Sequence, residues 1–291
     1  MKIGIFGRED DPIADHTEAV ARSRGHEVVR IAFGKMQSGA ATAFDGCSWL
    51  WLGEEIEACD AFVVRQYPAA HALLAPPDET ASAGEWFQRG MSQVERSSYA
   101  QSAIMDLELM GKPIVNPLLA SGPFDHKPLQ LSTFFRAGLP IPRTFITNFP
   151  DAVRIFDSDV RANGRMLITK PTAGGAETLV VDDAVRAKLD TIVQAPVIFQ
   201  ERIEGPDVRV TVVGGEVVSS VVVISEDGID YRRGEAYRRG EAQYLEHALS
   251  DDVKDLCVKA ADLCHHVLSG VDLKRASDGS YTILEANSAP V

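Results

Sequence analysis

The sequence lacks the features by which several classes of protein are recognised. Its four cysteines (Cys47, Cys59, Cys257 and Cys264) show no CxxC spacing, which argues against a zinc site and against a disulfide framework. No apolar run approaches the roughly eighteen residues of a membrane helix. The N-terminus MKIGIFGRED reads as a strand, because no long apolar stretch or cleavage site follows it. We therefore expect a cytoplasmic protein with reduced thiols and no membrane partner.

Positive charge is also scarce. The chain carries 29 Lys and Arg against 42 Asp and Glu, for a net charge of −13. Because binding to a phosphate backbone requires a basic surface, nucleic acid is not an expected partner. Against this acidic background, residues 231–242 repeat one hexapeptide, YRRGEAYRRGEA. Its four arginines form either a solvated charged loop or a local positive site for a small anion.

The pattern of elements changes once along the chain. Over residues 1–122, short apolar strands such as KIGIF, EVVRIAF and DAFVVRQ alternate with helices, which predicts a small parallel α/β domain. From residue 123 the pattern is α+β, with helices predicted over about 151–162 and over 250–269. We expect this part to consist of two subdomains, residues 123–199 and 200–291, in which most strands form hairpins.

The most informative segment is the C-terminal stretch GVDLKRASDGSYTILEANSAP. Asp278-Gly279 is a strong signal for a two-residue hairpin loop. With that loop, Asp272 lies opposite Glu285, and Asn287 shares their face because strand side chains alternate. On the other face Val271 meets Ala286 and Leu273 meets Leu284, which makes a core surface.

Two facing carboxylates need compensation. At about 5 Å they repel by roughly 3 kcal/mol at an effective dielectric of about 20. Asp272 and Glu285 with the amide oxygen of Asn287 are hard oxygen ligands that suit Mg²⁺. The alternatives are a solvated sheet edge, or a carboxylate paired with Lys274.

Two other segments suggest a binding cleft. Lys170 ends an apolar strand, and the turn PTAGGAE that follows could bring backbone close to an anion at Gly174 and Gly175. A plain surface hairpin explains the same pattern. In VIFQERIEGPDVRV, a buried strand leads to Glu201 and Arg202 at the edge of a cleft. An amphipathic hairpin follows, with a wet face that carries Asp207, Arg209 and Thr211.

Taken in order, these segments resemble the RimK-like carboxylate–amine ligases of the ATP-grasp superfamily. The resemblance covers about residues 95–291 and rests on five stretches: DHKPLQLSTFFRAGLPIPRT, RMLITKPTAGGAETLVV, FQERIEGPDVRVTVVGGEVV, DYRRGEAYRRGE and GVDLKRASDGSYTILEANSAP. It implies an ATP-grasp fold, in the α/β and α+β class, preceded by an α/β pre-ATP-grasp domain.

The resemblance also implies roles for individual residues. Mg²⁺, with Mn²⁺ as an alternative, would be held by Asp272, Glu285 and Asn287. Arg232 would be catalytic, stabilising phosphates and the developing oxyanion, and Arg238 would bind substrate, although the repeat leaves their roles interchangeable. Relatives usually carry serine or asparagine after the arginine, where this chain has Arg233-Gly234. Lys127 and Lys170 would contact the phosphates of ATP, with Gly174 and Gly175 in the loop that covers them. The adenine edge would be formed by Glu201, Arg202 and Ile203, largely through backbone groups, and Asp207 would contact the nucleotide.

The implied reaction joins a carboxylate to an amine at the expense of ATP, through an acyl phosphate. Addition of an amino acid such as glutamate to a peptide, protein or cofactor tail is the first expectation. Formation of ω-ester or ω-amide rings on a ribosomal precursor peptide is the alternative enzyme, and an ATP-binding regulatory protein without turnover is the alternative of a different class. A homo-oligomer remains open. Relatives usually continue with a further helix after Pro290, so either the chain is shortened or a partner chain closes the site.

Overall fold

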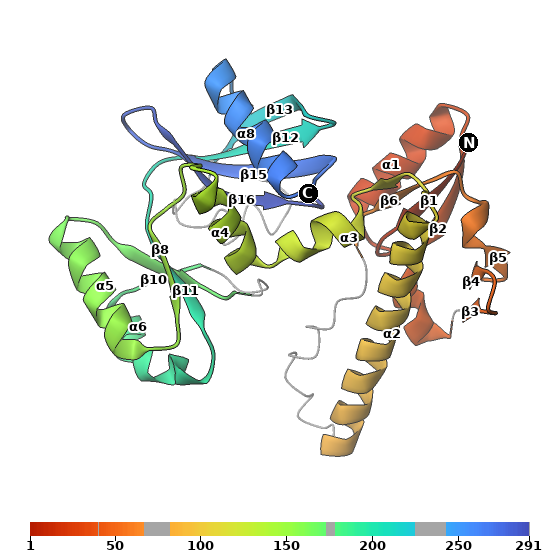
Figure 1. The fold of residues 1–291 in the computed structure, drawn as a ribbon, viewed down its shortest axis with the longest axis horizontal. Coiled ribbons are helices and arrows are strands. Elements are labelled where there is room, and N and C mark those ends of the chain that lie inside the picture. The colour runs from red at the N-terminus through yellow and green to blue at the C-terminus, as the bar shows by residue number, and fades with distance from the viewer. Residues whose placement is uncertain (40, 67–81, 173–177, 225–242, 291) are drawn as a thin grey trace. The chain divides into compact units, whose positions relative to one another are not determined.

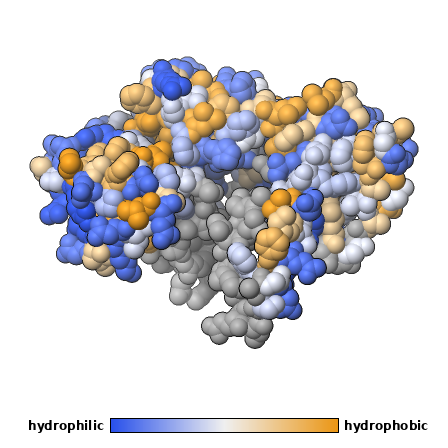
Figure 2. All heavy atoms as spheres, turned by 60° about the horizontal axis from the view of Figure 1, so that its bottom comes forward, coloured by the Kyte–Doolittle hydropathy of each residue, from blue (hydrophilic) through white to orange (hydrophobic). Residues whose placement is uncertain are grey.

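The computed structural model describes residues 1–39, 41–66, 82–172, 178–224 and 243–290. The chain divides into two compact units, residues 1–122 and 123–290, each described by itself below. Helices and strands are mixed in both (Figure 1), as the sequence predicts. Within the described ranges no helix is both long and apolar enough to cross a membrane. On the face shown in Figure 2, hydrophilic and hydrophobic side chains are intermixed.

The first unit is built on a parallel sheet of order β2-β1-β6-β7, which confirms the predicted parallel α/β arrangement. A small antiparallel sheet, β3-β4-β5, was not predicted from the sequence. The strands are β1 (Lys2–Phe6), β2 (Glu27–Ile31), β3 (Thr42–Phe44), β4 (Trp49–Trp51), β5 (Glu54–Glu55), β6 (Ala61–Val64) and β7 (Ile114–Val115). The helices are α1 (Pro12–Ser23), α2 (Ala83–Leu109) and α3 (Leu118–Ser121), with 3₁₀ turns η1 (Phe33–Ser38), η2 (Ile56–Ala58) and, across the unit boundary, η4 (Gly122–Asp125).

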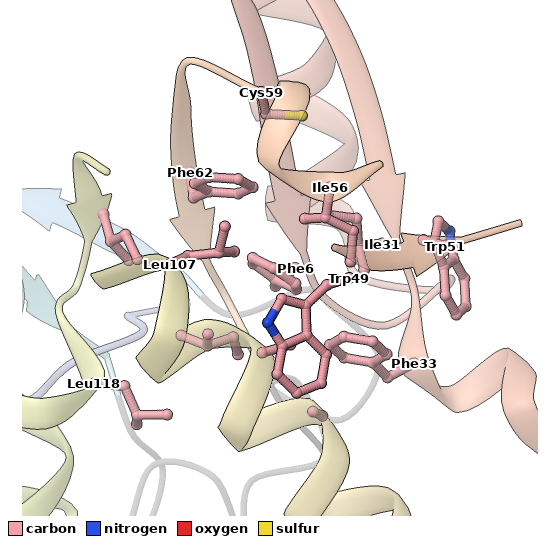
Figure 3. Packing of buried hydrophobic residues seen from close by; sticks show 14 of the residues in the cluster. Phe6, Ile31, Phe33, Trp49, Trp51, Ile56, Cys59, Phe62, Leu107 and Leu118 are labelled. Atoms are coloured by element: carbon pink, nitrogen blue, oxygen red, sulfur yellow. The ribbon is translucent and has the colours of Figure 1, made fainter. Parts of the chain in front are cut away.

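Aromatic residues fill the core of this unit (Figure 3). The ring of Phe6 stacks on those of Phe33 and Phe62, each at a centroid distance of 5.5 Å. Trp49 and Trp51 from β4 are almost fully buried in the same cluster, so the small sheet covers one side of the core. Aromatic side chains bury a large apolar area each, which suits a sheet with only four short strands.

The second unit contains two antiparallel sheets. One has the order β10-β9-β11-β8 and the other the order β14-β13-β12-β15-β16. The strands are β8 (Thr144–Thr147), β9 (Leu167–Lys170), β10 (Leu179–Val180), β11 (Val197–Glu201), β12 (Asp207–Val213), β13 (Glu216–Val223), β14 (Tyr244–Glu246), β15 (Leu268–Arg275) and β16 (Tyr281–Asn287). The helices are α4 (Lys127–Arg136), α5 (Pro150–Ala162), α6 (Asp183–Arg186) and α8 (Asp251–Leu263), with the 3₁₀ turn η5 (Leu189–Gln194). A subdomain boundary between residues 199 and 200 falls inside β11.

The five-stranded sheet has one apolar and one polar face, because its strands alternate. In β12, Val208, Val210 and Val212 are buried in a core that also contains side chains from α4 and α8. Arg209 and Thr211, which alternate with the valines, are only partly buried. The amphipathic hairpin expected from the sequence is therefore present, but Asp207 on its polar face is buried rather than solvated.

The C-terminal hairpin differs from its predicted form at its loop and at a bulge, and the two differences shift the strand register in opposite directions. Ala276, not Ser277, is bonded to Ser280 (2.9 Å from N to O), so the loop contains three residues, with Gly279 at φ 85°. Further along, the register shifts by one at a bulge, and Leu273 pairs with Ile283 rather than with Leu284. Ile283 takes the buried core position because of this bulge.

Beyond the bulge the predicted pairing is restored. Asp272 lies opposite Glu285, and Val271 lies opposite Ala286, as the sequence predicts. The longer loop alone would have placed Asp272 against Leu284. The extra residue at the bulge corrects this offset, so the two carboxylates still face each other.

The helix predicted over 250–269 is shorter, which corrects that expectation. Helix α8 ends at Leu263, and β15 already begins at Leu268. His265 adopts the left-handed conformation with φ 55°, which turns the chain out of the helix. His266 follows it into the core, 5% exposed, with Nδ1 at 3.0 Å from Ser269 Oγ.

Burial of His266 gives the stability a pH dependence. Burial lowers the pKa of His266 from 6.5 to about 4, with His265 adding to the shift and the Asp125 carboxylate opposing it. Between these values the unfolded chain binds a proton that the folded chain does not. The free energy of unfolding should therefore fall by about 3 kcal/mol as the pH drops through this window.

This loss should disappear in His266→Asn, which keeps a hydrogen-bonding group near Ser269 but does not titrate there. Urea unfolding at a series of pH values measures the effect as the difference between the two proteins. Parallel stability curves for wild type and variant would show that His266 does not contribute.

Candidate functional site

The polar face of the five-stranded sheet brings the three predicted metal ligands together. Asp272 projects from β15, and Glu285 and Asn287 project from β16 beside it. The Asn287 amide donates from Nδ2 to Asp272 Oδ2 at 3.1 Å and to Glu285 Oε1 at 3.3 Å. All three side chains are thus within hydrogen-bonding distance on one surface.

Two cations compensate the facing carboxylates. Arg209 on β12 binds Asp272 with two parallel hydrogen bonds, Nε to Oδ1 at 2.9 Å and Nη2 to Oδ2 at 3.1 Å. Lys127, the first residue of α4, makes an ion pair from Nζ to Glu285 Oε2. Such bidentate and charge-assisted contacts are stronger than neutral ones, so they offset the repulsion predicted from the sequence. Lys274, the partner considered there, binds Asp207 instead.

The composition of the cluster suits a hard cation. Two carboxylates and one amide side chain offer oxygen ligands of the kind that Mg²⁺ takes in proteins. Within the described part of the chain, no group of three or more His, Cys, Asp and Glu side chains is arranged to hold a metal. The third predicted ligand here, Asn287, is an asparagine and so does not count toward such a group. The residues therefore fit Mg²⁺ provided that the Asn287 amide presents its oxygen and Lys127 moves away from Glu285.

The segment between the two sheets is held by a buried ion pair. Lys274 is 4% exposed, and its Nζ donates to Asp207 Oδ2 at 2.9 Å and to the Gly205 carbonyl at 3.1 Å. Gly205 has φ 128°, and a Cβ at this position would lie 1.9 Å from the Arg275 carbonyl oxygen. Only glycine fits so close an approach, so the backbone here is fixed against the C-terminal hairpin.

Two clefts adjoin this segment. One, of about 360 Å³, is lined by residues of the β9 side and of the C-terminal loop, and the other, of about 560 Å³, by β12 and β13 residues including Asp207. Arg202 and Glu204 line both clefts, and Ile203 lines the first. The predicted adenine edge is therefore located at a cleft.

Glu201 differs from its neighbours because its side chain is buried and paired with arginines. The residue is 3% exposed, and its carboxylate makes an ion pair with Arg165 and lies 4.0 Å from an Arg143 nitrogen. Glu201 lines neither cleft, and its amide donates to the Arg143 carbonyl at 2.9 Å, so of the predicted adenine edge only Arg202 and Ile203 lie at a cleft wall.

The remaining predicted residues are placed as follows. Lys170 ends β9, opposite Ile198 of β11, in the four-stranded sheet rather than beside the carboxylates. Gly174, Gly175, Arg232 and Arg238 lie outside the described residues.

Sequence reasoning named two cations of this site but not their partners. Arg209 was predicted on a polar face, not as the partner of Asp272. Lys274 was considered as the partner of a carboxylate on the metal-binding face, which is wrong, because it binds Asp207. The alternation of β12 places both Asp207 and Arg209 on the polar face. Their partners, however, can be identified only when the neighbouring strand is known. Once β12 is known to pair with β15, Arg209 lies directly opposite Asp272, and Asp207 opposite Lys274.

Comparison with families and curated proteins confirms the predicted resemblance. Residues 127–291 match the model of the RimK-like ATP-grasp domain. Beta-citrylglutamate synthase B from Danio rerio is 27% identical over 255 residues, 85% of this chain and 56% of that protein. A probable alpha-L-glutamate ligase from Enterobacter sp. (strain 638) is 27% identical over 201 residues, 66% of this chain and 65% of that protein. The chain thus spans less than two thirds of the length of these curated relatives.

Solved structures match almost end to end. The ATP-grasp ligase PsnB complexed with a minimal precursor is 30% identical, with a TM-score of 0.81 over 99% of this chain and 90% of that chain. A second PsnB structure, with the same identity and TM-score, contains Mg and ADP beside a phosphomimetic variant of the precursor. Macrocyclase MdnC bound with precursor peptide MdnA from Microcystis aeruginosa MRC is 20% identical, with a TM-score of 0.78, and supports the fold alone.

Proposed function

This chain belongs to the RimK-like ATP-grasp family, and we propose that it is an ATP- and Mg²⁺-dependent ligase that activates a carboxylate of a peptide substrate. The bond formed is an amide, or an ester where the attacking group is a hydroxyl. The sequence resemblance alone favoured a free amino acid as one substrate. The likeness to a ligase complexed with a precursor leads us to propose the alternative considered with it, in which the peptide supplies both reacting groups.

The observation that carries this proposal is the extent of the likeness to PsnB. It includes residues 1–122 as well as the ATP-grasp part, at 30% identity over 99% of the chain. Beta-citrylglutamate synthase B matches over 85% of this chain and the glutamate-ligase relative over 66%, each at 27% identity. An activity that needs both units is therefore better supported by the likeness to PsnB than by either of these.

We assign the described site residues roles that follow from their positions. Asp272, Glu285 and Asn287 would hold Mg²⁺, which lowers the negative charge that opposes attack on a phosphoryl group. Lys127 would exchange Glu285 for a phosphate oxygen of ATP, and Lys170 would approach the phosphates from β9. The segment 201–203 would meet the adenine at the cleft, with Asp207 fixed beside it by Lys274.

The proposed reaction has two steps. A carboxylate oxygen of the substrate attacks the γ-phosphorus of ATP, the bond to the β-phosphate oxygen breaks, and ADP leaves. An amine or hydroxyl then attacks the acyl carbon, loses its proton to solvent, and phosphate leaves. Arg232 is assigned to the charge that develops on the acyl oxygen, because a guanidinium donates two hydrogen bonds in a fixed geometry.

Ligation of a free amino acid is the second candidate. It is favoured by the relatives named probable alpha-L-glutamate ligase and beta-citrylglutamate synthase B, each 27% identical to this chain. The two candidates differ in whether the bond forms within one molecule or between two.

An ADP-release assay with product mass spectrometry separates them. The protein with Mg²⁺ and ATP is offered peptides that contain both acidic and Lys, Ser or Thr side chains, and separately free amino acids with dicarboxylates. The proposal expects ADP release with a peptide, whose mass falls by one water per bond. A product that contains an added amino acid supports the second candidate, and ATP binding without ADP release in either panel contradicts both.

Lys170→Ala should weaken ATP binding. The substitution removes a charge directed at phosphate, and a charge-assisted contact contributes roughly 1.5–3 kcal/mol, which corresponds to about a tenfold to hundredfold change in dissociation constant. Calorimetric titration with ATP and Mg²⁺ measures it, and Lys188→Ala, a lysine of the same subdomain outside the proposed site, serves as control. Equal ATP affinity in the two variants would show that Lys170 does not contact the phosphates.

A further inference from the structure

The strand that carries two of the proposed metal ligands is held by a side chain of α4. Gln130 is 4% exposed, and its Nε2 donates to the Ala286 carbonyl at 2.8 Å. Its Oε1 accepts from the Ala286 amide at 3.0 Å. One side-chain amide thus satisfies both backbone groups of a single residue, and that residue lies between Glu285 and Asn287.

This contact supplies hydrogen bonds of the kind that a neighbouring strand would make. Among the strands that the structure describes, β16 is the edge of the five-stranded sheet, with β15 as its neighbour. At Ala286 the Gln130 amide supplies the donor and the acceptor that a sixth strand would supply. Gln130 Nε2 also donates to the Phe124 carbonyl at 3.1 Å, which anchors the amide itself.

The same helix also delivers Lys127 to this strand. Lys127 lies three residues before Gln130 on α4, and its Nζ binds Glu285, the residue directly before Ala286. Residues three apart share one face of a helix. The α4 face therefore holds β16 at two consecutive residues, by a charge at Glu285 and by an amide at Ala286.

We propose that Gln130 is a positioning residue for metal binding: by clamping the backbone of Ala286 it fixes the directions in which Glu285 and Asn287 project. Because strand side chains alternate, a backbone fixed with Ala286 facing the core holds both neighbours on the polar face. The inference rests on the proposed Mg²⁺-dependent function and adds a residue that acts through the backbone of Ala286.

Gln130→Met tests the proposal, since it retains the approximate volume and removes all three hydrogen bonds. Partners that orient metal ligands typically contribute about 10- to 100-fold to metal affinity. The Mg²⁺ concentration needed for half-maximal ADP binding should rise by that factor, whereas ADP binding in EDTA should not change. Hydrogen exchange at the Ala286 amide should also become faster. If Gln130→Met does not fold, Gln130→Asn replaces it, because its shorter side chain does not reach the Ala286 backbone. It should likewise raise the Mg²⁺ concentration needed for half-maximal ADP binding.

A matched control is Lys112→Met in the first unit. Lys112 Nζ likewise donates to two backbone carbonyls, those of Glu57 at 2.6 Å and Cys59 at 2.9 Å. Its loss should lower the melting temperature without changing the Mg²⁺ dependence. If the Gln130 variants behave like Lys112→Met, the positioning role is overturned while the proposed function stands. If wild type itself binds ADP without any dependence on Mg²⁺, the proposed function is overturned, and this inference with it.

Discussion

Glu285→Gln should abolish the stabilisation that Mg²⁺ adds to the ATP complex and lower turnover by about 10²–10³-fold. The substitution keeps the shape of the side chain but removes one of the two negative charges proposed to hold the metal. Metal ions contribute several kcal/mol of charge stabilisation to phosphoryl chemistry, and each 1.36 kcal/mol or so corresponds to a tenfold change in rate. Lys127 also loses its partner, since Nζ is paired with this carboxylate.

Thermal shift with ATP, in Mg²⁺ and in EDTA, measures the first effect, and ADP release measures the second. Glu216→Gln is the matched control, because it removes the same charge from an exposed position on β13 of the same sheet. The metal assignment is wrong if ATP stabilises the protein equally with and without Mg²⁺, or equally in wild type and Glu285→Gln.

Arg232→Ala should lower turnover by about 10²–10³-fold and change ATP affinity little. Loss of one donor to a developing oxyanion has this cost in comparable sites. Arg232→Lys should restore little activity, because an ammonium lacks the planar two-pronged geometry. Arg238→Ala should mainly raise the Michaelis constant of the substrate that carries an additional anionic group.

The repeat itself provides the controls. Arg233 and Arg239, the neighbours in each copy, should tolerate alanine better than Arg232 and Arg238. If the two copies are interchangeable, each single variant will be mild and the Arg232→Ala/Arg238→Ala protein inactive. A double variant with near wild-type turnover would show that the arginines form only a solvated charged segment.

The carboxylate face was predictable because it depends on local rules. The Asp-Gly turn signal and the alternation of a strand suffice to place Asp272 opposite Glu285 with Asn287 beside them. Even so, the prediction succeeded through two errors that cancel, the loop length and the bulge at Leu284. Whether Ile283 or Leu284 enters the core depends on how each fits the packed neighbours, which alternation does not reveal.

The features that sequence reasoning missed are tertiary. Arg209 meets Asp272 only because β12, which is distant in sequence, lies next to β15. The end of α8 depends on one residue, His265, in the left-handed conformation, while the apolar residues after it continue a pattern that suits helix and strand alike. Gln130 contacts Ala286 across 156 positions of sequence, so no local sequence pattern predicts this contact.

Transfer of a labelled oxygen tests the central claim most directly. A peptide that the protein accepts as substrate, as shown by ADP release, is prepared with ¹⁸O in its carboxylates. The inorganic phosphate formed is then analysed by mass spectrometry. An acyl phosphate keeps one carboxylate oxygen on the phosphoryl group, so the account predicts one labelled oxygen in the phosphate for each bond formed. Phosphate without label, alongside a ligated product, would contradict carboxylate activation by ATP at this site.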